Sequence, residues 1–216
     1  MQGDSRVQSI SLRNLNFLLK TLAEEMKPWY AEIDPGHEVF KEQEKKPSLH
    51  AELITSHLLA AYLKADSGKK HLHPAKKYWD LFSKKRAQVV LTYQWKMGLS
   101  GNTGVLKMIE DSGIPLDTEL WIDVWFIDQN SRNIGVELAI SQEYYILCPV
   151  HLIASPRIEV DIEDTSHVCR RGWCLWELGL RAHSKKPSFI LGALVWKVKN
   201  LCVLHNFLMQ IILKVR

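Results

Sequence analysis

From residue 87 onward, short runs of β-favouring apolar residues alternate with stretches of helical character, and this alternation constrains the fold more than any other feature. The runs expected to form strands are 87–93, 120–127, 144–153 and 187–194. The helices expected between them lie at 105–111, from about 133, and at 172–182. Strands and helices that alternate with short connections form parallel βαβ units. The sequence therefore predicts an α/β domain with a parallel sheet.

The ends of these strands are the places to look for a binding site. Ligands of open parallel sheets lie beyond the carboxyl ends of the strands, which here indicates residues 92–96 and 123–128. Pro149 lies inside the third run and cannot donate a ladder hydrogen bond, so we expect that strand to end or bulge there.

The first 86 residues have a different pattern, because their apolar residues recur at helical spacing. One amphipathic helix is expected to carry Leu12, Leu15, Leu18, Leu19, Leu22 and Met26. A second is expected over 48–64 with Ser48 as its N-cap, and a short third one over 73–85 with Pro74 in its first turn. We therefore expect an all-helical segment over 1–86, an α/β domain over 87–195, and an apolar, basic C-terminal segment over 196–216.

The charge distribution argues against nucleic acid as the main partner. The net charge is +4 overall, but residues 87–184 carry 7 basic and 13 acidic side chains, while 185–216 carry 6 basic and none acidic. An acidic central domain is a poor partner for a phosphate backbone. The basic ends are read as solvated surface.

The four cysteines are too few for a disulfide scaffold of this length, and the N-terminus shows no apolar signal core. We therefore expect a cytoplasmic protein. The most apolar run, 201–213, is too short to span a bilayer. The histidines and cysteines match no metal-ligand spacing, so no metal site is expected; those considered were Cys148, His151, His167, Cys169 and Cys174.

Glu177 is the most unusual position. It lies in an expected helix that is apolar on nearly every face, and a carboxylate is costly to bury unless it is paired. Two readings stay open: an ion pair with Arg181 one helical turn later, or a carboxylate that faces a pocket and acts on a ligand.

Four segments in order resemble the TIR (Toll/interleukin receptor) domain family, across roughly residues 87–194. AQVVLTYQW resembles the family's first strand, LWIDVWF its second, and ELAISQEYYILCPVHLIASP its following helix and third strand. RGWCLWEL matches the family's Trp-Cys-x-x-Glu-Leu signature, which is the most specific of the four. The resemblance implies a flavodoxin-like three-layer α/β fold. The family has a further helix and strand after 194, so 196–216 is either a divergent or an incomplete end.

In catalytic members of the family, the glutamate of that signature is the essential residue of an NAD+ glycohydrolase, and the matching residue here is Glu177. The resemblance also implies a signalling role in innate immunity, self-association, other TIR-like proteins as partners, and NAD+ as substrate with no further cofactor. Nicotinamide leaves as a neutral pyridine, so one carboxylate that stabilises positive charge on the ribose suffices.

The same resemblance implies a set of substrate-binding residues. Tyr93 matches the aromatic residue at the end of the first strand, and Asp123 matches the acidic residue that closes the second. Gln94 and Trp95 stand where many members carry a basic residue, so no cation is available there for the pyrophosphate. Aromatic stacking on Trp95 or Trp125 would compensate. Trp173 of the signature motif completes the set.

Two other functions remain open. A non-catalytic TIR-like adaptor that acts by homotypic association fits the missing basic residue after Tyr93. An unrelated flavodoxin-like domain would use Glu177 only to pair with Arg181.

Overall fold

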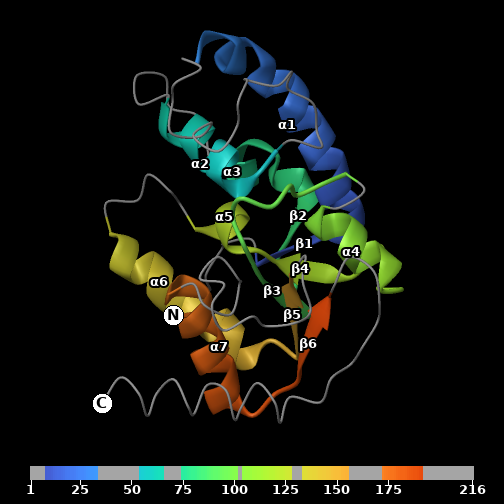
Figure 1. The fold of residues 1–216 in the computed structure, drawn as a ribbon, viewed down its shortest axis with the longest axis vertical. Helices are drawn as coiled ribbons and strands as arrows, with labels where there is room; N and C mark the ends of the chain where they lie inside the picture. Colours follow the sequence, from blue (N-terminus) through green and yellow to red (C-terminus); the bar gives the residue numbers. More distant parts are fainter. Residues whose placement is uncertain are drawn as a thin grey trace.

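The computed structural model describes residues 8–33, 54–65, 74–101, 104–127, 133–155 and 172–191 (Figure 1). The predictions for Ser48 and for 196–216 lie outside these ranges, as do His167 and Cys169. The described segments form a mixed α/β structure around a six-stranded, mostly parallel sheet.

The order of strands in the sheet is β2-β1-β4-β3-β5-β6. The strands are β1 (Ser9–Ser11), β2 (Phe82–Ser83), β3 (Val89–Tyr93), β4 (Glu119–Trp121), β5 (Val150–Ala154) and β6 (Ser188–Leu191). The neighbours β4-β3-β5-β6 pair in parallel, whereas β1 pairs antiparallel with both β2 and β4. The predicted parallel sheet is therefore confirmed.

The helices lie on both sides of this sheet (Figure 1). They are α1 (Leu12–Glu32), α2 (Ser56–Ala65), α3 (Pro74–Lys77), the 3₁₀ turn η3 (Trp79–Leu81), α4 (Val105–Asp111), α5 (Asp123–Phe126), α6 (Ile134–Leu147) and α7 (Gly172–Ser184). In β3, Val89 and Leu91 belong to a core shared with α1, α2 and α4, while Val90 belongs to a second core with Tyr145 of α6. Because successive side chains of a strand point to opposite faces, both faces of the sheet are buried.

The second predicted strand, 120–127, is wrong beyond Trp121, because the chain turns there into α5. The carboxylate of Asp123 accepts a hydrogen bond from the backbone N–H of Val124 at 2.7 Å. Such local side-chain bonds offer the backbone an alternative to the sheet ladder. The apolar run continues through the turn because α5 is itself buried.

The third predicted strand, 144–153, is wrong in its first half. Residues up to Leu147 belong to α6, and β5 begins at Val150. Pro149 thus separates a helix from a strand, which fits its missing N–H and the restriction that it places on the preceding residue. The apolar pattern did not reveal the boundary because a buried helix end and a buried strand have the same composition.

The all-helical prediction for 1–86 is wrong at two points, since β1 and β2 both come from this segment. Ile10 of β1 is fully buried opposite Leu120 of β4. Strands of two or three residues are too short to show a period of two, and so the sequence pattern missed them. The first helix is confirmed as α1, which the hydroxyl of Ser11 caps by accepting the N–H of Asn14 at 3.2 Å.

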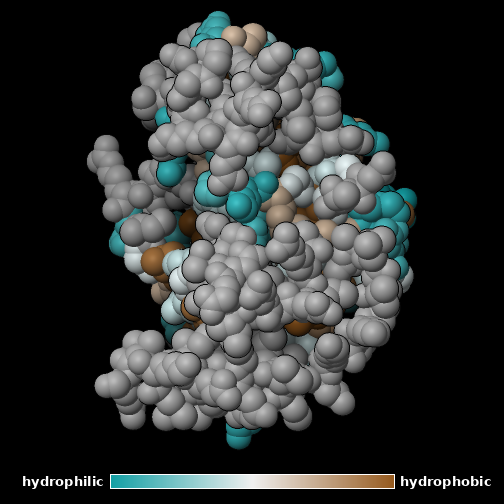
Figure 2. All heavy atoms as spheres, in the orientation of Figure 1, coloured by the Kyte–Doolittle hydropathy of each residue, from teal (hydrophilic) through white to brown (hydrophobic). Residues whose placement is uncertain are grey.

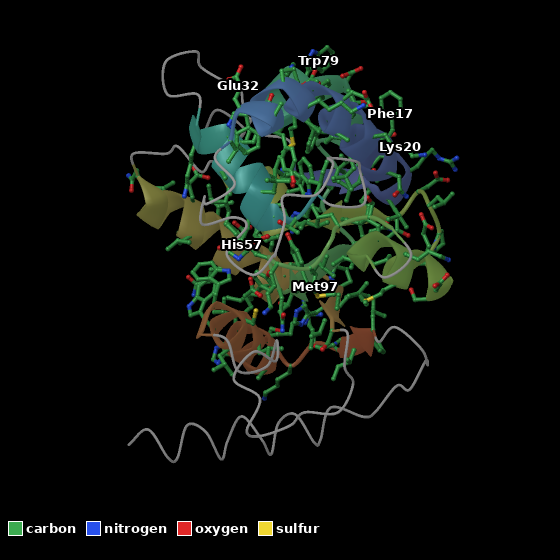
Figure 3. All side chains as sticks on the ribbon, turned by 45° about the horizontal axis from the view of Figure 1, so that its top comes forward. Phe17, Lys20, Glu32, His57, Trp79 and Met97 are labelled. Atoms are coloured by element: carbon green, nitrogen blue, oxygen red, sulfur yellow. The ribbon has the colours of Figure 1, made fainter. Side chains whose placement is uncertain are left out.

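We predict that α1 stabilises the α/β core directly, because its apolar stripe lies in the same cluster as β3, β4 and β5. Leu19→Ala should lower the free energy of unfolding by about 2–5 kcal/mol, the usual cost of a cavity in a core. Phe17→Ala is the matched control on the same helix, because Phe17 is 60% exposed (Figure 3). Equal effects of both substitutions in denaturant titrations would contradict a shared core.

Candidate functional site

The carboxyl group of Glu177 is enclosed where α7 crosses the carboxyl-terminal half of β3. Its side chain is 2% exposed. Thr92 of β3 donates its hydroxyl proton to Oε2 at 2.6 Å, and the hydroxyl of Tyr145 from α6 lies 2.7 Å from Oε1. Three elements that are distant in the sequence therefore meet on this one side chain.

A chain of hydrogen bonds continues from Glu177 across the sheet. Nε2 of His151 lies 2.8 Å from Oγ1 of Thr92, and Nδ1 lies 2.9 Å from the hydroxyl of Ser188. Because the proton of Thr92 goes to Glu177, Thr92 accepts from an Nε2–H, and Ser188 then donates to Nδ1. Burial lowers the pKa of His151 to about 3, aided by the charge of Arg181, so this imidazole is neutral.

The hydrogen bonds of the Tyr145 hydroxyl indicate whether Glu177 is protonated. It lies 2.9 Å from the carbonyl oxygen of Leu91 and 2.7 Å from Glu177, yet it has one proton to donate. A carbonyl oxygen can only accept, so all contacts are satisfied when Tyr145 donates to Leu91 and a protonated Glu177 donates to Tyr145. Burial and the charge of Asp123 together raise the pKa of Glu177 to about 8, although hydrogen bonds with Thr92, Tyr145 and Trp173 lower it, and a raised pKa agrees with this arrangement.

Arg181 is buried one turn along α7, but it does not pair with Glu177. Its N–H groups donate to backbone carbonyl oxygens at 2.6–3.2 Å, and the acceptors belong to Tyr145, Cys148, Pro149 and Pro187. All five N–H donors of the guanidinium, one on Nε and two each on Nη1 and Nη2, are used in these hydrogen bonds. The ion-pair reading is therefore wrong, because the guanidinium binds the turns that precede β5 and β6.

On the opposite face of β3, three of the predicted residues form a second polar cluster. The indole N–H of Trp95 donates to Oδ2 of Asp123 at 2.7 Å, and the hydroxyl of Tyr93 lies 3.4 Å from Oδ1. The same hydroxyl also contacts the hydroxyl of Ser56, at the start of α2. Burial raises the pKa of Asp123 to about 6, although these hydrogen bonds and that from Val124 lower it.

The N-terminal turn of α2 covers the outer side of this second cluster. The backbone N–H of His57 donates to the carbonyl of Trp95 at 3.3 Å, and the two rings pack edge to face with centroids 5.6 Å apart. Figure 3 shows His57 and Met97 on neighbouring parts of this surface. Sequence reasoning assigned neither Ser56 nor His57 to a site, because the helix that carries them comes from the N-terminal segment.

The other predicted site residues lie outside this second cluster. Gln94 is buried next to Tyr93, and Trp125 is fully buried in the main core, so neither presents a surface for stacking as the structure stands. Trp173 lies on the first turn of α7, where it is 38% exposed and stacks on Trp176 at a centroid distance of 4.8 Å, and its side chain hydrogen-bonds the carboxyl group of Glu177. The structure thus brings together Tyr93, Trp95 and Asp123, and separates Trp125 from them.

Sequence reasoning predicted Trp173 as a site residue but missed Tyr145 and the two residues behind Thr92. Tyr145 was assigned to a strand, His151 was considered only as a metal ligand, and Ser188 was not singled out. A polar residue inside an apolar strand was the one available signal, since His151 must be hydrogen-bonded where it is buried.

Within the described ranges, no group of three or more His, Cys, Asp and Glu side chains is arranged to hold a metal ion. Among the helices of those ranges, none combines the length and the apolar character needed to cross a bilayer. Comparison of the chain with protein-family models, with curated proteins and with solved structures gives no significant match.

We predict that replacing Arg181 by a neutral residue lowers the stability of the protein much more than replacing Glu177 by a neutral residue does. Arg181→Met leaves the carbonyl groups of Tyr145, Cys148 and Pro149 without this donor and should cost at least about 3 kcal/mol of stability, at 1–3 kcal/mol for each unsatisfied acceptor. Glu177→Gln reproduces the protonated carboxyl, accepting from Thr92 and donating to Tyr145, and should cost about 1 kcal/mol or less. Comparable losses in urea unfolding would restore the ion-pair reading.

We also predict a specific pH dependence of stability. The raised pKa of Glu177 means that the folded state holds a proton which the unfolded chain releases near pH 4.3. Stability contributed by this group is therefore complete below about pH 4 and is lost as the pH rises towards about 8. The free energy of unfolding of the parent, relative to Glu177→Gln, should fall over this range. A difference that is constant with pH would show that Glu177 is ionised throughout.

Proposed function

We propose that the chain is a TIR-like NAD+ glycohydrolase with a flavodoxin-like core, in which Glu177 is the catalytic carboxylate. The order β4-β3-β5-β6 supports the fold, because it corresponds to 2-1-3-4 in the sequence of the parallel strands, as in the doubly wound order 2-1-3-4-5. The signature RGWCLWEL and the order of the other motifs support the family.

The observation that carries the proposal is a buried carboxyl group with no cation against it. The hydrogen-bond partners of Glu177 are the neutral side chains of Thr92, Tyr145 and Trp173, while the nearby Arg181 is occupied by carbonyl groups. A carboxylate that the protein does not neutralise retains its full attraction for positive charge. In a site from which water is excluded, such a group stabilises a cationic transition state strongly.

The reaction needs this one property. When the C–N glycosidic bond breaks, both bonding electrons leave with nicotinamide, which departs as a neutral base, and positive charge develops on the ribose. The ionised carboxyl of Glu177 stabilises that charge, and Thr92 fixes its orientation. Water then attacks the anomeric carbon and loses its second proton to solvent, which gives nicotinamide and ADP-ribose. A ribose hydroxyl that attacks instead gives the cyclised product.

The second cluster is suited to hold the rest of the substrate. Asp123 accepts the indole N–H of Trp95 and thereby fixes the plane of the ring, whose edge packs on His57. A fixed indole at the carboxyl end of β3 offers a stacking surface for a nucleotide base. Self-association through the TIR-like domain is part of the same proposal, and light scattering at high protein concentration measures it.

One observation favours the alternative, a non-catalytic adaptor. Glu177 is almost fully enclosed and its contacts are satisfied, so a ribose reaches it only when the first turns of α7 move. If they do not, the network is structural, and the protein acts through contacts between copies of its domain.

Incubation of concentrated protein with NAD+ at pH 7 and pH 8.5 distinguishes the two functions. The parent should release nicotinamide, faster at the higher pH because Glu177 ionises with a pKa of about 8. Glu177→Gln should reduce the rate by at least about 100-fold, the scale on which loss of a preorganised electrostatic group lowers kcat. Glu137→Gln, on the partly exposed part of α6, is the matched control and should retain the parent's rate.

Chromatography of the products supplies the readout. Nicotinamide release that survives in folded Glu177→Gln would overturn the catalytic assignment. Absence of release from a folded, self-associated parent would support the adaptor.

A further inference from the structure

A cavity of about 520 Å³ opens at the edge of the sheet opposite the candidate site. It is lined by residues that directly precede β3 and β5, among them Ala87, Gln88 and Pro149, and by one side of α6. Glu177 and Asp123 lie towards the carboxyl ends of the strands, so the cavity is separate from both. Its volume lies in the range of small-molecule pockets, 300–1,000 Å³.

The inner wall of the cavity is built from aromatic rings. Tyr144 stacks on Trp121 with ring centroids 4.8 Å apart and an angle of 16° between the planes, and Trp121 stacks on Phe126 at 6.0 Å and 19°. Because Trp121 is only 1% exposed, the half-buried rings of Tyr144 and Phe126 are the ones that a ligand can meet. Ile140 and Leu147 of α6 extend this wall.

The same side of α6 is apolar towards solvent. Figure 2 shows hydrophobic side chains gathered where α6 lies in Figure 1. Leu147 is 44% exposed although it borders the cavity. Binding of a flat apolar group is favoured at such a wall, because the group covers the exposed apolar side chains and removes them from water.

One guanidinium group lies in the lining of the cavity. Arg86 lines it, is exposed, and has no hydrogen-bond or ion-pair partner among the described residues. Lys84 and Lys85 precede Arg86 directly, and Lys186, which is not part of the lining, donates to the carbonyl of the lining residue Leu147. Glu143 is the opposing charge in the lining. A guanidinium fork with free donors is suited to bind a carboxylate, sulfonate or phosphate group.

We propose that this cavity is a second binding site, which takes a flat aromatic molecule that carries one acidic group. The aromatic body packs on the ring of Tyr144 and against Leu147, and the acidic group binds the guanidinium of Arg86. The site does not depend on the function proposed for Glu177, because the two share no lining side chain.

The test uses two fluorescent probes with the full chain. The first, 8-anilinonaphthalene-1-sulfonate, has an aromatic body and an anionic group; the second, N-phenyl-1-naphthylamine, has the same body without the charge. We expect the anionic probe to bind at one site, more weakly as salt is added, because the contact with Arg86 is electrostatic. The neutral probe should bind more weakly and without salt dependence.

Substitutions then locate the site. Arg86→Gln should weaken binding of the anionic probe about 10-fold and leave the neutral probe unchanged, and Glu143→Gln should strengthen the anionic probe about 3-fold. Leu147→Glu, at an exposed position that spares the core, should weaken both probes. Tyr144→Ala should do the same, and thermal melts of this variant show whether it remains folded.

Trp79→Ala is the matched control, because Trp79 is an aromatic side chain that is 70% exposed and does not line the cavity (Figure 3). It should leave both affinities unchanged. Loss of binding in Trp79→Ala, or unchanged binding in both Leu147→Glu and Tyr144→Ala, would overturn the proposed site. Equal effects of Arg86→Gln on the two probes would overturn the proposal that the ligand carries an acidic group.

Discussion

The carboxyl group of Glu177 has to be matched by hydrogen bonds where it is buried, and much of the structure depends on how this is done. Thr92 on β3 and Tyr145 on α6 contact it directly, and His151 on β5 supports Thr92 from behind. A shift of one residue in the register of β3 against β5 would turn Thr92 to the other face and leave the carboxyl without its donor. The polar network thus selects one register among the many that an apolar sheet tolerates.

At the amino-terminal edge of the same sheet, Arg181 satisfies backbone carbonyl groups by donating hydrogen bonds to them. Its guanidinium joins the end of α6 to the turn before β6, by donating to the carbonyl groups of Cys148 and Pro187. The two charged residues of α7 therefore act at opposite ends of the strands, and neither neutralises the other. An ion pair between them would have left those carbonyl groups unsatisfied and would have cancelled the field of the carboxylate.

The sequence predicted the parts whose periodicity is long enough to read. The stripe of α1 and the run Val89–Tyr93 are confirmed, because each is regular over its whole length. Residues 144–153 and β1 were not predictable in this way: one passes from helix to strand without a change of composition, and the other has three residues. Glu177 was identifiable because it interrupts an apolar helix. Its partner Tyr145 was not, since an aromatic residue in an apolar run is ordinarily core.

The alternation of β3 explains why two acidic clusters lie so close together without sharing a face. Thr92 points towards Glu177 and Tyr93 towards Asp123, so the backbone of the strand separates the two carboxyl groups. Charge acts across that backbone, and the negative charge of Asp123 raises the pKa of Glu177. Any positive charge placed beside Asp123 reverses this effect and favours ionisation of Glu177, without contact between the two faces. The state of one face of the sheet therefore sets the proton affinity of the other.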